Sequence, residues 1–380
     1  MNHFRAFQFR QVFKQILQLM ILPCAYGFWR MVYFRRPVDR IVLADAHHDA
    51  MPYSMENICR ELTRRGYTVT TDICNYKNMS ILGSCLRALR FMRLYAQARY
   101  VFICDNFLPV VSCRKNSNTT VIQLWHSCGL LKKMGYDTQE DVPKGYRGNM
   151  YRNYDLVTVS APCCVGPLSG GMRLNPGIVK PLGVSRTDNY FSRQWREDCA
   201  REFYRKYPGW KGKKLILWAP TFRGNAGNPT QVGVEAVNQL EKVLGPDYVV
   251  IRKVHPYVDA RYHLSNCDIP TERLFPVIDL LISDYSSVVC EFMAFQKPYV
   301  LFAPDLRDYS RTRGFYVPYE SLSPYIAENE ESLHRCVLEA VNDPADWVEP
   351  LREFHLQACD GNATGRILDY VGLKEVYANV

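Results

Sequence analysis

The chain has 380 residues, of which 47% are hydrophobic and 22% charged, and its formal net charge is +9. This balance is that of a folded globular protein and excludes an intrinsically disordered chain. The length suits two domains better than one core, and a basic surface favours an anionic partner such as nucleic acid, anionic lipid or a phosphate-rich substrate.

The 14 cysteines form neither a CxxC pair nor the spacing of a zinc site. We therefore expect free thiols in a reducing cytosol, and we find no secretory signal with a cleavage site. His47, His48 and Asp49 are adjacent in sequence, but no further ligand is evident, so we expect no metal and no other cofactor. The absence of GxxxxGKS or GxxxxGKT excludes a P-loop enzyme.

Residues 1–38 contain no acidic side chain, and their apolar run, 15–29, is shorter than the ~20 residues that cross a bilayer. Basic residues beside Phe, Trp and Leu favour a helix that lies in the interface of an anionic membrane. The alternative is a helix that packs on the core. The basic residues of this segment are Arg5, Arg10, Lys14, Arg30, Arg35 and Arg36.

From residue 40 onward, short apolar runs alternate with amphipathic stretches. The pattern weakens over 181–189, where Pro181 and Gly183 interrupt it, so we place a domain boundary there. The predicted strands before this boundary are 41–46, 67–73, 100–105, 120–126 and 156–161, and the predicted helices are 51–65 and 81–98.

The same alternation restarts after the boundary. The predicted strands are 214–220, 248–256, 279–284 and 298–304, and the predicted helices are 232–244, 288–295, 331–341, 347–358 and 364–377. Near-continuous apolar strands between helices are typical of parallel sheets covered on both faces. We predict an α/β protein with a basic amphipathic segment, 1–38, and two Rossmann-like domains, 39–185 and 186–380. Such domains bind ligands at the carboxyl ends of their strands.

Polar residues gather at these predicted strand ends. Asp284, Ser286 and Ser287 follow one strand and open a helix, where backbone N–H groups and hydroxyls can hold a phosphate; an ordinary serine cap is the alternative. Asp284 can cap locally or meet a hydroxyl of the ligand. Arg252 precedes His255 at another strand end, and an imidazole there can donate to a diphosphate, although a His before Pro is often a plain loop residue.

His126 follows a strand of the first half, where a neutral imidazole can act as general base on an acceptor hydroxyl. Lys132 and Lys133 can hold an anionic acceptor. Cys128 is a conceivable nucleophile, but nothing nearby marks a lowered thiol pKa.

Two further groups complete the set of candidate residues. Thr221 and Arg223 follow the strand of LWAPTFRG, and Gly224 permits a close backbone approach. Arg311 and Arg313, in RDYSRTRGFY, can fork onto phosphate oxygens.

Five motifs occur in order between about residues 119 and 319: QLWHSCGLLKKMGYD, LWAPTFRG, IRKVHP, DLLISDYSSVVCEF and KPYVLFAPDLRDYSRTRGFY. They resemble the CDP-glycerol glycerophosphotransferase family, the wall-teichoic-acid primases and polymerases. The resemblance implies a GT-B fold, two Rossmann-like domains facing a central cleft, with CDP-glycerol held by the C-terminal domain.

The resemblance also implies residue roles. His126 is then the acceptor-side catalytic histidine, and the chain is peripheral to the cytoplasmic face of the cell membrane. Asp284 and Thr221 fall on motif positions without a firm role. The implied contacts of the diphosphate are His255, Ser286, Ser287 and Arg313.

The sequence departs from the family pattern at two places. Many members read WHGTPLK where this chain has His126-Ser127-Cys128-Gly129, which puts the identity of the acceptor in doubt. Many carry Asp where this chain has Glu291, and the longer carboxylate can indicate a different polyol.

We therefore expect a phosphotransferase that moves glycerol phosphate from CDP-glycerol to a polyprenyl-diphosphate-linked acceptor and releases CMP, in the synthesis of a teichoic-acid-like or capsular polymer. CDP-ribitol is an alternative donor. The same strand-end pattern is compatible with a GT-B glycosyltransferase that uses a nucleotide sugar, and with a non-catalytic binding protein. The basic residues form no recognised nucleic-acid module, so we expect no nucleic-acid partner.

Overall fold

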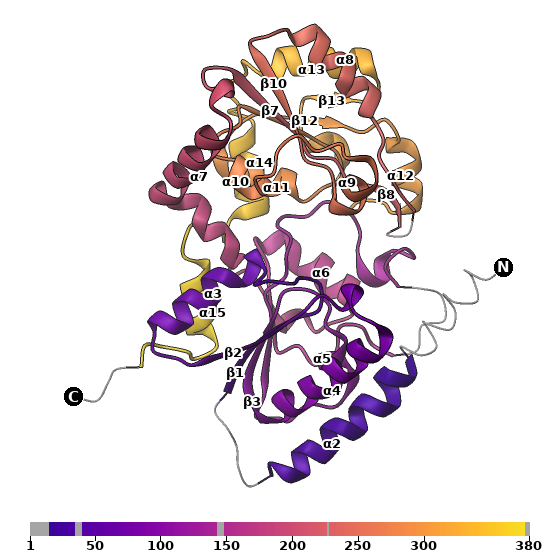
Figure 1. Cartoon of the computed structure of the whole chain (residues 1–380), viewed down its shortest axis with the longest axis vertical. Helices are drawn as coiled ribbons and strands as arrows, with labels where there is room; N and C mark the ends of the chain where they lie inside the picture. Colours follow the sequence, from indigo (N-terminus) through magenta and orange to yellow (C-terminus); the bar gives the residue numbers. More distant parts are fainter. Residues whose placement is uncertain (1–14, 35–39, 143–147, 226–227, 377–380) are drawn as a thin grey trace, which may run out of the picture. The chain divides into compact units, whose positions relative to one another are not determined.

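The computed structural model describes residues 15–34, 40–142, 148–225 and 228–376. The chain forms two compact units that are not continuous halves (Figure 1). Unit 1 comprises Met1–His126, Asp141–Asp188 and Asn362–Val380, and unit 2 comprises Ser127–Glu140 and Asn189–Gly361.

Unit 1 is built on a six-stranded sheet in the order β2-β1-β3-β4-β5-β6, in which every pairing is parallel. The strands are β1 (Arg40–Asp45), β2 (Val69–Ile73), β3 (Ala98–Ile103), β4 (Thr120–Gln123), β5 (Leu156–Thr158) and β6 (Val179–Lys180). The helices are α3 (Tyr53–Arg64), α4 (Ile81–Gln97), α5 (Leu108–Ser112), α6 (Val165–Met172) and α15 (Ala363–Tyr370). In β3, Val101, Phe102 and Ile103 are all buried, because helices cover the sheet.

The C-terminal helix α15 belongs to unit 1 because it fills part of that unit's core. Ile367 and Leu368 pack among the buried side chains of β1, β3 and α3. The carboxylate of Asp188 accepts hydrogen bonds from the N–H groups of Ala363 and Thr364, at 2.9 and 2.8 Å, and so caps the first turn of α15.

An N-terminal helix packs on α4 at the edge of unit 1 (Figure 1). It begins as a π-helical turn, η1 (Leu17–Ile21), and continues as α2 (Leu22–Val32). Tyr26 is buried against Tyr95, with ring centroids 5.0 Å apart, and its hydroxyl accepts the N–H of Asn116 at 2.9 Å. Among the described residues, no helix is both long enough and apolar enough to cross a membrane.

Unit 2 has a five-stranded parallel sheet in the order β10-β7-β11-β12-β13 and a two-stranded antiparallel ribbon of β8 and β9. The strands are β7 (Lys214–Trp218), β8 (Arg223–Asn225), β9 (Asn228–Thr230), β10 (Tyr248–Arg252), β11 (Leu280–Ser283), β12 (Tyr299–Phe302) and β13 (Ile326–Ala327). The helices are α7 (Arg193–Lys206), α8 (Val234–Leu244), α9 (Pro256–Tyr262), α10 (Thr271–Leu274), α11 (Val288–Phe292), α12 (Leu306–Thr312), α13 (Glu330–Ala340) and α14 (Val348–Leu356).

The predicted α/β class with parallel sheets is confirmed. We predicted two continuous domains, 39–185 and 186–380. In the structure, residues 127–140 belong to unit 2 and residues 362–380 belong to unit 1. The structure adds elements that the sequence pattern did not predict. They are the helices α5, α6, α7, α9, α10 and α12, the β8–β9 ribbon and the short strands β6 and β13. Of the basic N-terminal residues, only Arg30 lies within the described part of the chain.

Candidate active site

His126 lies just beyond the carboxyl end of β4 in unit 1, after a turn in which Trp125 has a φ of 58°. Its Nδ1 is 3.1 Å from the carbonyl oxygen of Cys104 and 3.8 Å from the carboxylate of Asp105. A carbonyl can only accept, so Nδ1 carries the proton and the lone pair of the neutral ring is on Nε2. His126 is therefore held in the tautomer of a general base.

A second imidazole lies at the carboxyl end of β1, in the turn that follows Asp45. His48 Nδ1 is 2.9 Å from Asp45 Oδ2, and His47 Nε2 is 3.1 Å from the carbonyl oxygen of Asn106. Within the described ranges, no group of three or more His, Cys, Asp or Glu side chains is placed to hold a metal ion.

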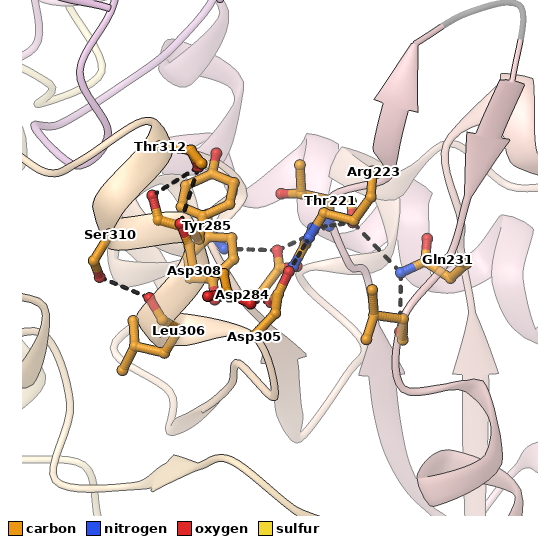
Figure 2. Close-up of polar contacts among 12 residues, drawn as sticks. Thr221, Arg223, Gln231, Asp284, Tyr285, Asp305, Leu306, Asp308, Ser310 and Thr312 are labelled. Carbon is orange, nitrogen blue, oxygen red and sulfur yellow. Dashed lines mark hydrogen bonds and ion pairs between the residues drawn. The ribbon is translucent and has the colours of Figure 1, made fainter.

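In unit 2, the polar site is organised around Arg223, which follows β7 and begins β8 (Figure 2). Its Nε and Nη2 form a fork on Asp305, at 2.6 and 2.9 Å, and Nη2 also contacts Asp284 at 3.1 Å. Its Nη1 donates to the carbonyl oxygen of Thr221 at 2.6 Å. One guanidinium thus ties together the ends of three neighbouring strands, β7, β11 and β12.

Two stacked tyrosines cover this guanidinium. The rings of Tyr285 and Tyr309 are 3.7 Å apart, and Arg223 Cζ lies 4.9 and 5.4 Å from their centroids. Burial opposes ionisation of Asp305, but the hydrogen bond and charge of Arg223 outweigh it and hold the pKa of Asp305 below its ordinary value. Burial, with the charge of Asp305, raises the pKa of Tyr285, whose hydroxyl donates to Asp305 at 3.0 Å. Arg223 and Asp305 therefore form an ionised pair that is largely buried.

Asp284 follows β11 and is almost fully buried. Its Oδ1 accepts the N–H groups of Thr221 and Tyr285 at 2.8 and 2.6 Å, so the structure shows the local-capping alternative for this carboxylate. Ser286 Oγ accepts the N–H of Val288, while Ser287 makes no side-chain cap bond at the start of α11. The double serine lies at the strand end predicted for it.

Thr221 and Gln231 line the same strand end. Gln231 Nε2 donates to the carbonyl oxygens of Thr221 and Val232, at 3.4 and 3.2 Å (Figure 2). In the described part of the chain, Thr221 Oγ1 and Gln231 Oε1 are buried atoms without a hydrogen-bond partner. A hydroxyl and an amide oxygen can both accept hydrogen bonds from a bound group.

His255 lies at the start of α9, beyond the carboxyl end of β10. Its Nδ1 accepts the N–H of Tyr257 at 3.2 Å, and its ring packs against Phe222 with centroids 4.5 Å apart. Because Nδ1 is the acceptor, the proton of the neutral ring is on Nε2. His255 is therefore held as a hydrogen-bond donor, the opposite of His126.

The segment after His126 packs on the RGFY motif within unit 2. Leu131 and Lys133 form backbone hydrogen bonds with Tyr316 and Gly314, at 2.8 and 3.0 Å. Lys132 forms a β-bridge with Phe315. Lys132, expected in the first domain with His126, is thus a unit 2 residue.

Arg313 fixes this packing. Its Nε donates to the carbonyl oxygen of Lys133 at 3.1 Å, and its Nη1 pairs with Glu140 at 3.0 Å. The buried His355 accepts the N–H of Leu130 at 3.1 Å. In this structure Arg313 holds the segment that follows the catalytic candidate, and its contact with a diphosphate stays a prediction.

Two predicted residues lie away from the strand-end cluster. Glu291 is buried, and its carboxylate accepts the hydroxyl of Tyr190 at 2.6 Å inside unit 2. In this structure the carboxylate of Glu291 bonds to the interior of unit 2, and its contact with the polyol stays a prediction. Arg252 is the last residue of the edge strand β10. Its side chain forms an ion pair with Glu241 in α8.

Sequence reasoning missed Asp305, Gln231 and the tyrosine pair Tyr285 and Tyr309. Asp305 closely follows β12, so the rule that polar residues gather at strand ends would have found it. Gln231 has no such signal, because it follows a ribbon that the sequence pattern does not reveal.

The two units, each with a parallel sheet and polar side chains at the carboxyl ends of its strands, define an α/β protein of the kind that binds ligands at those strand ends. The chain belongs to the CDP-glycerol:poly(glycerophosphate) glycerophosphotransferase family, whose model matches residues 30–373. The chain is therefore a phosphotransferase, as predicted from its motifs.

Individual relatives support the family assignment. The chain is 29% identical over 356 residues to a teichoic acid ribitol-phosphate primase of Bacillus spizizenii, covering 88% of this chain and 90% of that one. It is 28% identical over 290 residues to a teichoic acid glycerol-phosphate primase of Bacillus subtilis, covering 71% and 73%. It spans 60%, 57% and 62% of the length of three ribitol-phosphate polymerases that it also matches.

The fold has a solved counterpart. The structure of the wall teichoic acid polymerase TagF superposes with a TM-score of 0.73 over 96% of this chain and 97% of that chain, at 18% identity. This likeness shows the shared fold.

Proposed function

We propose that this protein transfers a polyol phosphate, glycerol phosphate or ribitol phosphate, from its CDP-linked donor to a lipid-linked acceptor and releases CMP. The observation that carries the proposal is the pair of histidines with opposite tautomers. His126 presents a lone pair, and His255 presents an N–H donor. Transfer of a phosphoryl-linked group needs one of each, a base for the acceptor hydroxyl and a donor for the diphosphate.

Unit 1 supplies the acceptor chemistry in this proposal. His126 Nε2 takes the proton of the acceptor hydroxyl, and Asp105, 3.8 Å from Nδ1, stabilises the imidazolium that forms. The acceptor oxygen then forms a bond to the β-phosphorus of the donor, and the bond from this phosphorus to CMP breaks. The acceptor is a hydroxyl of a sugar or polyol phosphate on a polyprenyl diphosphate.

Unit 2 supplies the donor site. His255, Ser286, Ser287 and Thr221 hold the diphosphate and the polyol with hydrogen-bond donors. The Arg223–Asp284–Asp305 network fixes the turns that carry these donors, because each charge in it is paired inside the protein. Positioning and charge neutralisation are what this reaction class mainly requires.

Glycerol and ribitol are both considered because the relatives include primases named for each polyol. The test is CMP release with CDP-glycerol, CDP-ribitol and UDP-N-acetylglucosamine, each with a synthetic polyprenyl-diphosphate disaccharide that ends in glycerol phosphate. We expect CMP with one CDP-polyol and a product heavier by polyol phosphate, with product length read by mass spectrometry. UDP release from UDP-N-acetylglucosamine with transfer of the sugar, or no CMP with either CDP-polyol, contradicts the proposal.

The protein is further proposed to work at the anionic cytoplasmic face of the membrane. Met20, Phe28 and Met31 form an exposed stripe on the face of the N-terminal helix opposite Tyr26; Met31 is 73% exposed. Leu82 and Leu86 are exposed on α4, which packs beside this helix. A stripe of large apolar side chains beside basic residues is typical of an interfacial helix.

A further inference from the structure

The turn after β1 fixes one imidazole of unit 1 unusually firmly. Asp45 is 2% exposed, and its Oδ2 accepts the backbone N–H groups of His47 and His48 at 2.7 and 2.8 Å. The same oxygen accepts His48 Nδ1 at 2.9 Å. The side chain of His48 is nevertheless 53% exposed. The buried carboxylate of Asp45 holds the ring at Nδ1, and Nε2 is the other ring nitrogen.

This turn belongs to the same edge of the sheet as His126. β3 pairs with β1 and with β4, and all three strands are parallel, so their carboxyl ends adjoin. His47 Nε2, 3.1 Å from the carbonyl oxygen of Asn106, joins the turn after β1 to the turn after β3. Asp105, in the latter turn, is 3.8 Å from His126. His48, Asp105 and His126 therefore form one cluster within unit 1.

We propose that His48 is an acceptor-binding residue: its imidazolium, paired with Asp45 through Nδ1–H, donates Nε2–H to a second hydroxyl of the acceptor, next to the hydroxyl that His126 deprotonates. This inference rests on the proposed transfer to a lipid-linked acceptor and names the group recognised, a pair of neighbouring hydroxyls. A ring already oriented by a buried carboxylate loses little freedom when it binds.

The charges around His48 favour a hydroxyl over a phosphate. The groups that face it are Asp45 and Asp49 from its own turn and Asp105 from the turn after β3. The hydrogen bond to Asp45 is the largest cause of the raised pKa of His48, and burial opposes it. Even with an imidazolium and the nearby Arg186, the three carboxylates leave this corner net negative, so His48 is better suited to a hydroxyl than to a phosphate. A hydroxyl can accept from His48 and donate to a carboxylate at once.

The test uses two synthetic acceptors on the same polyprenyl-diphosphate disaccharide. One ends in glycerol phosphate, and the other ends in the phosphate of propane-1,3-diol, which keeps the primary hydroxyl but lacks its neighbour. The wild-type protein is expected to prefer the glycerol acceptor by roughly 10- to 100-fold in kcat/KM, the value of one charge-assisted hydrogen bond.

Three variants separate this role from a structural one. His48→Asn can keep the hydrogen bond to Asp45 while losing Nε2, and it should abolish the preference while leaving the KM for the CDP-polyol unchanged. His48→Gln, which can place an N–H near Nε2, should restore part of it. His263→Asn is the control, since His263 is an exposed unit 2 histidine with a φ of 50° that Asn adopts readily.

The outcomes are distinct. Equal use of both acceptors by the wild type, or an undiminished preference in His48→Asn, overturns the inference and leaves the proposed function standing. A wild-type protein that releases CMP with neither acceptor overturns the proposed function and this inference with it.

Discussion

The carboxyl ends of the two sheets both carry polar side chains, but these differ in exposure and in how they are paired. In unit 1, His126 and His48 are half exposed, and one ring edge of each is held by a backbone or carboxylate oxygen. In unit 2, Arg223 is 16% exposed, with each of its nitrogens bonded to protein. Exposed imidazoles suit proton transfer with an acceptor that enters and leaves. A closed ionic network suits the fixed geometry of a diphosphate site.

The largest expected effect is on turnover, and it comes from a substitution in unit 1. His126→Ala should lower kcat by roughly 10²- to 10⁴-fold, because it removes the proposed base. The fold should survive, since the side chain is half exposed. CMP release and circular dichroism measure the two effects. A variant with near-normal turnover would disprove the assignment of the base.

Removal of Arg223 tests the unit 2 side. Arg223→Ala leaves the buried Asp284 and its partner Asp305 without their cation, so we expect a loss of about 3 to 5 kcal/mol in the free energy of unfolding. The affinity for the donor should fall as well, because the turns after β7, β11 and β12 are no longer held together by the Arg223 side chain. Denaturant unfolding gives the first quantity. Arg201→Ala, at an exposed pair with Asp198, is the control and should change stability by less than about 1 kcal/mol.

The packing of the segment after His126 can be tested by pH. Burial lowers the pKa of His355 to about 4 from an ordinary value of about 6.5. Below pH 6.5 the unfolded chain binds a proton that the folded chain does not, so His355 costs stability as the pH falls from 6.5 to 4, by about 3 kcal/mol at most. His355→Asn, which can still accept from Leu130, should lose less stability than the wild type over this window. Parallel melting curves would contradict the burial of a neutral imidazole here.

The smallest effect concerns the exposed stripe of the N-terminal helix. Phe28→Glu should reduce partition onto vesicles that contain anionic lipid by about tenfold, because it places a charge where an apolar side chain would be buried. Turnover of a short-chain soluble acceptor should not change. Leu338→Glu, at an exposed leucine of α13, is the matched control. If Phe28→Glu binds vesicles as well as the wild type does, the proposal that this face of the N-terminal helix contacts the membrane is wrong.

Much of the fold was accessible from hydrophobic pattern, and the exceptions have physical reasons. The strands β1, β7 and β11 were predicted because they are continuous apolar runs. Helix α7 was missed although Trp195, Cys199 and Phe203 recur at helical spacing, because few apolar residues among many charged ones give a weak pattern. The membership of residues 127–140 in unit 2 depends on the bridge from Lys132 to Phe315, a pairing without a local signal.

The candidate site could be predicted only where a polar motif directly follows a predicted strand. The places of His126 and His255 at strand ends were predicted in this way, but their tautomers depend on the carbonyl of Cys104 and the N–H of Tyr257. The bond between Glu291 and Tyr190 was not predicted, because a position in a helix does not reveal such a partner. Short-range pattern cannot report such contacts, since they are set by packing across the unit.

Equilibrium binding of the CDP-polyol to two variants tests the division of labour most directly. The account predicts that His126→Ala binds the donor within about twofold of the wild type although turnover is lost, and that His255→Ala weakens binding by about tenfold or more, the value of a hydrogen bond to a charged group. Equal loss of donor binding in both variants, or full binding in His255→Ala, would contradict it.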